Sequence, residues 1–436
     1  MRLFDTASRE IVPFEVGATV TMYTCGITPY DSTHLGHAAT YLGYDVLQRR
    51  LRDLGHDTRC VRNVTDVDDS ILGKARELGV HYLDLAAGEI ARFDHDMATL
   101  ETIPSYAEPR ATSAIADIRG FIGMVLDGGY AYQAGGAVYF EVSKYDGFGA
   151  ISGYDRDQML AFAAERGGNV EDSNKRDPLD FVLWQPSLDD EPAWDSLWGP
   201  GRPGWHIECS ALCLRELGTT IDLHGGGSDL IFPHHECEAA QSEAATGTPL
   251  VRHWMHQAMV HKDGEKMSKS LGNLVFVSDL VATWDPRVVR LTVVEHHYRE
   301  AWEWADEAMP RNDERLRQWV AAGAGSGALG EVRAALDHDL STPDAIAAID
   351  AAAARGVGVS EAAALLGVDT GRAVGTWPPG VEPHSLSVDS ELAVIRSSIR
   401  AMMCRLVQRC RVGGVDVGLV GRSERCKIGS TASSSR

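Results

Sequence analysis

Two histidines, His34 and His37, stand three residues apart in the sequence HLGH and could act on phosphate groups. The motif lies where an expected loop enters an expected helix, and a helix N-terminus offers free backbone N–H groups and the positive end of the helix dipole. Imidazoles at this spacing share one helical face and could stabilise charge that develops on a phosphate. Surface and capping histidines are often spaced in the same way, so the pair alone leaves its chemistry open.

A second candidate for phosphate chemistry is the pentapeptide KMSKS, which begins at Lys266 and follows an expected strand and a glycine-containing turn. Lys266, Lys269 and two hydroxyls on a mobile loop suit a triphosphate that must be held while pyrophosphate leaves. An arbitrary Lys-x-x-Lys is more often a solvated basic loop. The complete pentapeptide is rare, however, and favours phosphate binding.

A third group of residues has the chemistry of a metal site. Cys25 ends an expected strand, Cys209 lies in GWHIECSALC, and His234 and Glu238 are four residues apart, on one face of an expected helix that begins near Pro233. Two thiolates, an imidazole and a carboxylate form a plausible zinc set. Such an ion, with a position open for substrate, would bind the thiolate of free cysteine much better than serine. Taken one at a time, each residue could equally be a buried cysteine or a core histidine.

The elements that must position these residues follow a strand–helix–strand pattern. The β-branched and aromatic run 19–25 predicts a strand, the apolar spacing of 34–54 predicts a helix, and 58–65 predicts a second strand. This order predicts an α/β protein with a parallel sheet, in which a ligand binds at the carboxyl ends of the strands.

The rest of the chain divides into further regions. We expect a catalytic core from residues 1–80 and 186–280, with an inserted α/β subdomain at 81–185. Residues 281–375 have helical spacing, interrupted by an Ala/Gly-rich stretch at 321–330 that predicts a flexible linker. Residues 376–436 are expected to form a linker and a basic, partly disordered tail.

Composition limits the classes of function. The 436 residues are 44% hydrophobic and 24% charged, as in an ordinary globular protein, and the net charge of -21 argues against a long-range field that attracts nucleic acid. Local basic patches remain possible, because residues 396–436 hold nine Lys and Arg against two acidic residues. With no membrane-spanning run and no signal-peptide pattern, we expect a cytoplasmic location and no membrane partner. The eight cysteines are then expected to be free thiols or metal ligands.

HLGH and KMSKS, in this order, resemble the ATP-activating site of class I aminoacyl-tRNA synthetases. The resemblance implies a Rossmann-like core, in which the carboxylate of an amino acid attacks the α-phosphate of ATP bound with Mg²⁺. It assigns His34 and His37 to the α-phosphate in the transition state, and Lys266 and Lys269 to the leaving pyrophosphate.

Over roughly residues 1–300 the sequence is similar to cysteinyl-tRNA synthetases. The shared motifs are MYTCG, NVTDVDD, KRDPLDFVLW, GWHIECSA and GGGSDLIFPHHECE. They imply activation of cysteine, with zinc held by Cys25, Cys209 and His234 and with Glu238 as the candidate for a fourth ligand. The same resemblance implies an adenylate pocket formed by Cys25, Gly26, Ile27, Thr28, Thr40, Asn63, Val64, Thr65, Trp205, Gly227, Ser228, Asp229 and Val260.

Several segments resemble a second branch of this family, the mycothiol cysteine ligases, which join cysteine to the amine of glucosaminyl-inositol. These segments are CGITPYD at 25–31, Ala39-Thr40 after HLGH, ERGG at 165–168 and Ser228. Glu238, Gln241 and the pair Asn169-Val170 depart from that branch, and the basic tail matches neither branch. ERGG could also be merely a charged helix end with a glycine stop.

We therefore expect an ATP-dependent ligase that forms cysteinyl-adenylate and transfers cysteine to glucosaminyl-inositol. The absence of an evident anticodon-binding region after residue 380 and the acidic charge argue against a tRNA partner. We expect a monomer with one zinc ion. The alternatives are a cysteinyl-tRNA synthetase with a reduced C-terminal region and a non-catalytic relative that binds cysteine or RNA.

Overall fold

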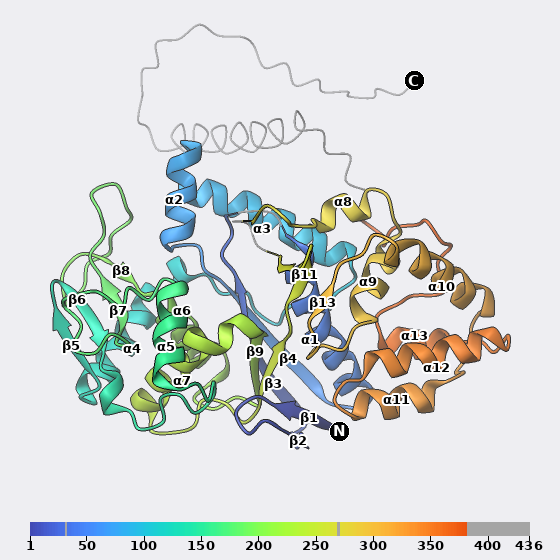
Figure 1. Cartoon of the computed structure of the whole chain (residues 1–436), viewed down its shortest axis with the longest axis horizontal. Helices are drawn as coiled ribbons and strands as arrows, with labels where there is room; N and C mark the ends of the chain where they lie inside the picture. The colour runs from blue at the N-terminus through green and yellow to red at the C-terminus, as the bar shows by residue number, and fades with distance from the viewer. Residues whose placement is uncertain (31–32, 268–270, 382–436) are drawn as a thin grey trace, which may run out of the picture. The chain divides into compact units, whose positions relative to one another are not determined.

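The central element of the fold is a four-stranded parallel sheet, seen in a computed structural model. The structure describes residues 1–30, 33–267 and 271–381, so Lys269 and the basic tail lie outside the described residues. The predicted α/β class with a parallel sheet is confirmed (Figure 1). The strands follow the order β10 (Trp254–Gln257), β9 (Leu223–Gly227), β3 (Thr19–Ile27) and β4 (Asp57–Val64).

The predicted strand–helix–strand unit is formed by β3, α1 (Leu35–Asp53) and β4. His34 is the N-cap of α1, and its Nδ1 accepts a hydrogen bond from the Gly36 N–H. This cap satisfies one of the backbone donors that every helix start leaves open. Beyond the helix the chain reverses at Gly55, whose φ of 93° suits glycine. The unit therefore places His34 directly after the carboxyl end of β3.

Strand β3 is buried on both faces. Val20 and Met22 pack in the hydrophobic core that contains α1, whereas Tyr23 and Cys25 belong to a second core on the other face. Successive side chains of a strand point to opposite faces, so this alternation follows from the extended backbone. It delivers the Cys25 thiol to the side of the sheet where α6 (Trp205–Leu217) and α7 (Glu236–Thr246) pack.

A second, antiparallel sheet lies beside that core, on the left in Figure 1. Helices α2 (Asp69–Leu78) and α3 (Tyr82–Thr99) precede this sheet in the chain. The boundaries of the inserted subdomain, at residues 81 and 185, remain a prediction from the sequence. The sheet and its helices are β5 (Ala131–Ala134), β6 (Ala137–Phe140), β7 (Phe181–Gln185), β8 (Arg202–Pro203), α4 (Ile115–Asp127) and α5 (Arg156–Glu165).

The chain after Trp284 is mainly helical, as its spacing predicts, and these helices lie on the right in Figure 1. No helix in the described part of the chain is long and apolar enough to cross a bilayer. Helix α8 (Val277–Val281) precedes Trp284, and the helices after it are α9 (Pro286–Val294), α10 (Ala308–Ala322), α11 (Leu329–Asp337), α12 (Thr342–Ala354) and α13 (Ser360–Leu365). The short strands are β1 (Arg2–Asp5), β2 (Glu10–Pro13), β11 (Val260–Lys262), β12 (Glu265–Lys266) and β13 (Trp302–Glu303).

The prediction of a flexible linker at 321–330 is wrong. The Gly327 N–H donates to the Gly358 carbonyl oxygen at 2.8 Å, and the Val359 N–H donates to the Gly323 carbonyl oxygen at 3.0 Å. A Cβ on Gly325 would lie 2.8 Å from the Gly358 oxygen. The glycines here allow two backbones to approach closely and bond to one another, a function that composition alone does not distinguish from flexibility.

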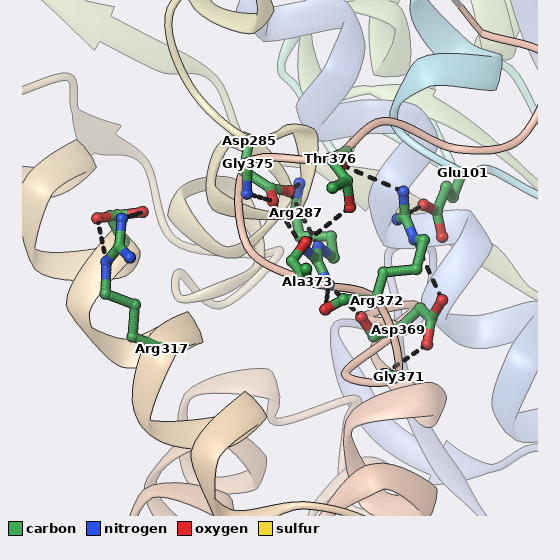
Figure 2. A network of polar contacts seen from close by, with 11 residues as sticks. Glu101, Asp285, Arg287, Arg317, Asp369, Gly371, Arg372, Ala373, Gly375 and Thr376 are labelled. Atoms are coloured by element: carbon green, nitrogen blue, oxygen red, sulfur yellow. Dashed lines mark hydrogen bonds and ion pairs between the residues drawn. The ribbon is translucent and has the colours of Figure 1, made fainter.

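A buried arginine ties α9 to the segment that follows α13 (Figure 2). The guanidinium of Arg287, 1% exposed, makes two hydrogen bonds to the Asp285 carboxylate, at 2.9 and 2.6 Å. It also donates to the carbonyl oxygens of Asp369, Arg372 and Ala373. Asp285 in turn accepts from the Gly375 N–H at 2.8 Å. The guanidinium and the Asp285 carboxylate are both out of water, so each depends on the other as its charge partner.

We expect Arg287→Met to lower the free energy of unfolding by about 3–5 kcal/mol, because it leaves the Asp285 carboxylate buried without its charge partner. The control is Arg317→Met on α10, whose exposed i, i+4 pair with Asp313 should contribute less than about 0.5 kcal/mol. Urea denaturation of both variants measures the difference. Equal stability of the two variants would contradict the prediction.

Candidate active site

A cavity of about 570 Å³ opens at the carboxyl ends of β3 and β9. This is the edge of a parallel sheet at which α/β proteins bind their ligands. Residues that sequence reasoning did not select, Tyr30, Gly36, Tyr41, Leu230, Met259 and Met267, complete its wall. The predicted site residues on the wall are Cys25, Gly26, Ile27, Thr28, His34, His37, Thr40, Gly227, Asp229, Val260 and Lys266.

The two histidines of HLGH meet at one end of this cavity. Their rings stack with centroids 3.8 Å apart and planes 27° from parallel. The Leu35 N–H donates to the carbonyl oxygen of Val275 at 2.8 Å, so the start of α1 is bonded to the chain that follows the lysine motif. Both imidazoles thus lie at a helix N-terminus on the cavity wall, an arrangement suited to an anionic ligand.

Lys266 reaches the cavity from β12. β11 and β12 are joined by a tight turn in which Asp263 and Gly264 have φ angles of 58° and 79°, as a two-residue hairpin requires. The Lys266 ammonium forms an ion pair with the Asp229 carboxylate, with Nζ and Oδ2 2.7 Å apart. The first lysine of the motif is therefore on the cavity wall.

The four predicted metal ligands come together below the cavity. The Sγ atoms of Cys25 and Cys209 are 3.9 Å apart, and Glu238 Oε1 lies 3.3 Å from Cys25 Sγ and 2.9 Å from His234 Nε2. All four side chains are buried, and the four ligand atoms lie within 4.8 Å of one another. Two thiolates about 2.3 Å from a tetrahedral zinc ion would be about 3.8 Å apart, so the donor set and its spacing fit zinc.

The predicted i, i+4 contact between His234 and Glu238 is present although α7 begins later than predicted, at Glu236. The preceding stretch, Ile231–His235, is kinked at Phe232, whose φ and ψ of -138° and 135° are extended. His235 has helical φ and ψ of -70° and -32°, so the two side chains keep helical spacing across the junction.

Electrostatics in the cluster favour ionised ligands. Burial opposes ionisation of Glu238, but the imidazoles of His224 and His234 outweigh it and hold the pKa of the carboxyl well below its ordinary value. A hydrogen bond from the Cys25 thiol lowers the pKa of Cys209 to about 6. Burial also opposes charge on His234, yet Glu238 and Cys209 raise its pKa to about 10. Cys209 and Glu238 therefore already favour the forms that bind a metal, whereas a metal ion would have to displace a proton from His234 and from Cys25, because burial and the neighbouring Cys209 raise the pKa of the Cys25 thiol well above its ordinary value.

Sequence reasoning missed three histidines that surround this cluster. His224 Nε2 lies 2.9 Å from Glu238 Oε2, His235 Nε2 lies 3.3 Å from Cys25 Sγ, and His256 Nε2 lies 2.7 Å from His235 Nδ1. Cys25, His224, His235 and Glu238 form a second group with metal-ligand spacing. The available signal was that two strand-like segments, TTIDLHGG and HWMHQAMV, carry His224 and His256; these segments contain β9 and β10, which pair as neighbours in the parallel sheet.

Five residues of the expected adenylate pocket are not on the wall of the cavity as the described residues define it. Two support the wall from behind: Asn63 Oδ1 accepts from the Gly26 N–H at 2.8 Å, and Asn63 Nδ2 donates to Thr65 Oγ1 at 3.2 Å. Trp205 stacks on His234, with ring centroids 4.2 Å apart. Gly26 has no room for a side chain, since a Cβ would lie 1.5 Å from the Asn63 carbonyl oxygen. The five residues are Asn63, Val64, Thr65, Trp205 and Ser228.

The parallel sheet, the histidine pair at the first helix and the lysine on the facing strand define a class I aminoacyl-tRNA synthetase catalytic core. The family described as tRNA synthetases class I (C) catalytic domain matches residues 12–314. The fold is also that of Mycobacterium tuberculosis methionyl-tRNA synthetase in complex with methionyl-adenylate, with a TM-score of 0.59 over 76% of this chain and 82% of that one, at 18% identity.

Curated relatives identify a narrower family for the chain within this class of protein. It is 49% identical to the L-cysteine:1D-myo-inositol 2-amino-2-deoxy-alpha-D-glucopyranoside ligase of Nocardiopsis dassonvillei, over 80% of this chain and 88% of the relative. It is 47% identical to the ligase of the same name from Thermobispora bispora, over 81% and 90%. The chain therefore belongs to the mycothiol cysteine ligase family, as the sequence resemblance implies.

Proposed function

We propose that this protein uses ATP to join L-cysteine to the amine of glucosaminyl-inositol. The observation that carries the proposal is the buried group of Cys25, Cys209, His234 and Glu238 next to a cavity with phosphate-binding features. The names of its relatives, which are ligases of cysteine and an amino sugar, supply the acceptor. Zinc, bound by these four residues, would supply the Lewis acid that binds the substrate thiol as a thiolate.

In the first step, the cysteine carboxylate attacks the α-phosphate of ATP bound with Mg²⁺. A bond forms between the carboxylate oxygen and phosphorus, and pyrophosphate leaves. His34 and His37 donate hydrogen bonds to the α-phosphate oxygens as charge develops there. Lys266, together with Lys269, binds the leaving pyrophosphate. The product is cysteinyl-adenylate, held in the cavity.

In the second step, the amine of the acceptor attacks the carbonyl carbon of cysteinyl-adenylate. An amide bond forms, the bond from the carbonyl carbon to the AMP oxygen breaks, and the amine loses a proton. The net charge of -21 does not oppose an amino sugar that arrives as a cation, whereas it opposes a polyanionic tRNA. A monomer in the cytoplasm remains our expectation from the sequence, and sedimentation of the purified protein tests the oligomeric state.

The test is an end-point assay by mass spectrometry with purified protein, Mg-ATP and L-cysteine. Either glucosaminyl-inositol or a tRNA(Cys) transcript is offered as the acceptor. We expect the amide, AMP and pyrophosphate with the amino sugar, and uncharged tRNA. Charged tRNA without amide would replace this proposal with a cysteinyl-tRNA synthetase. Reactions with L-serine should give little product, because a hydroxyl is a poorer ligand than a thiolate for zinc with two cysteines.

A further inference from the structure

The segment Glu165–Gly168 ends helix α5 in a tightly bonded turn. Gly167 has a φ of 81°, and the Gly168 N–H donates to the Ala163 carbonyl oxygen at 2.7 Å. A Cβ on Gly168 would lie 2.7 Å from that same oxygen, so the turn requires glycine. Lys175 Nζ donates to the Gly168 carbonyl oxygen from the other side. The turn therefore fixes Arg166 at the end of the helix.

The half-buried side chain of Arg166 points to a different part of the chain. Its Nη1 donates to the Asp229 carbonyl oxygen at 2.7 Å and also to the Phe232 carbonyl oxygen. Its guanidinium carbon lies 4.5 Å from the centroid of the Phe162 ring, which holds the group from behind. Charge-assisted hydrogen bonds of this kind are among the stronger ones in proteins. Arg166 thus holds the turn 228–235 at two points.

That turn carries groups of both parts of the site. At its start, the Asp229 carboxylate lines the cavity and pairs with Lys266. Near its end, His234 has supports of its own: its Nδ1 lies 2.9 Å from His206 Nδ1, and its ring stacks on Trp205. Arg166 bonds to the turn at Asp229 and Phe232, whereas the His234 side chain is held by His206 and Trp205.

We propose that Arg166 is a positioning residue that fixes the Asp229 carboxylate, and through it Lys266, at the reaction cavity. The reaction that it supports is the cysteine activation of the proposed function, on which this inference rests. The hydrogen bonds of Arg166 to the turn go to backbone carbonyl oxygens, so Arg166 acts through the backbone. Loss of its two hydrogen bonds would let the Asp229 carboxylate and the Lys266 ammonium leave their productive geometry, and small displacements of this kind are costly in rate.

The test uses Arg166→Gln and cysteine-dependent exchange of pyrophosphate into ATP, which needs only the first chemical step. The matched control is Arg156→Gln on the same helix, where the arginine is 53% exposed and forms a surface ion pair with Asp177. We expect kcat/KM for cysteine to fall by about 10- to 100-fold in Arg166→Gln and to stay unchanged in Arg156→Gln. Zinc content and the midpoint of thermal unfolding should match in the two variants, since His234 keeps its own supports.

A double-mutant cycle with Asp229→Asn distinguishes positioning from a general structural effect. If Arg166 acts through Asp229, Arg166→Gln should cause little further loss in the Asp229→Asn background. Equal fold-losses in both backgrounds, or full activity of Arg166→Gln, would overturn the proposal. If Arg166→Gln does not fold, Arg166→Lys, which keeps the charge but loses the forked donor, takes its place in the cycle.

The two proposals can fail separately. If the unaltered protein shows cysteine-dependent pyrophosphate exchange but forms no amide, the proposed acceptor is refuted. The double-mutant cycle of Arg166 and Asp229 can still be measured in that case, because it needs only the exchange reaction. No cysteine-dependent exchange at all would overturn both proposals.

Discussion

Cys209→Ala should abolish zinc binding and cysteine activation together. The substitution removes one of the two thiolates, which lies 3.9 Å from the other at Cys25. Loss of an outer-shell partner alone typically costs about 10- to 100-fold in metal affinity or activity, so loss of a ligand should cost more, about 1,000-fold or above. Metal analysis gives the zinc content, and cysteine-dependent pyrophosphate exchange gives the rate. In the cobalt-substituted protein, thiolate-to-cobalt absorption should also decrease.

The matched control is Cys213→Ala, one helical turn further along α6. Cys213 is as buried as Cys209, at 0% against 1% exposed, but belongs to neither group with metal-ligand spacing. Its replacement should leave the zinc content at one ion per chain and the exchange rate near that of the unaltered protein. A Cys209→Ala protein that kept full exchange activity would remove the metal role from this residue.

His37→Ala should lower the rate of adenylate formation by about 100- to 1,000-fold while cysteine binding changes little. The ring of His37 stacks on His34 at the cavity wall and is not part of either group with metal-ligand spacing, so its contribution is expected only when charge develops on the α-phosphate. Removal of one donor to such a charge has an effect of this size in other enzymes. Rapid-quench measurement of the first turnover gives the rate.

The control for this experiment is His56→Ala, beyond the other end of α1, where the imidazole Nδ1 donates to the Gly17 carbonyl oxygen at 2.8 Å. It should form adenylate at the unaltered rate. A first-turnover rate in His37→Ala equal to that of His56→Ala would show that His37 has no role at the phosphate.

The sequence predicted those parts of the fold and of the site whose geometry depends on the local pattern of residues. The β-branched run before Cys25 and the apolar spacing after His34 predicted β3 and α1 to within two residues. The four-residue spacing of His234 and Glu238 predicted their contact, which the structure has at 2.9 Å. In each case the backbone period alone sets which side chains share a face.

The remaining geometry depends on tertiary packing that spacing does not encode. The contact of His224 with Glu238 requires both the pairing of β9 with β3 and the packing of α7 on that sheet. The hydrogen bonds from Arg166 to the turn at Asp229 join segments 63 residues apart in the chain. The Ala/Gly-rich stretch at 321–330 was misjudged for the same reason, because its bonding partner at Gly358 is distant in sequence.

The wide separation of the metal ligands along the chain has a consequence for biosynthesis. Cys25 and Cys209 are 184 residues apart, and the segment between them contains the whole antiparallel sheet. The entropy of closing so long a loop must be overcome by folding of the intervening chain before the thiols can meet. With zinc bound by these four residues as proposed, the nascent polypeptide would complete its site only after Glu238 has emerged from the ribosome, and metal acquisition would be one of the last events of its maturation.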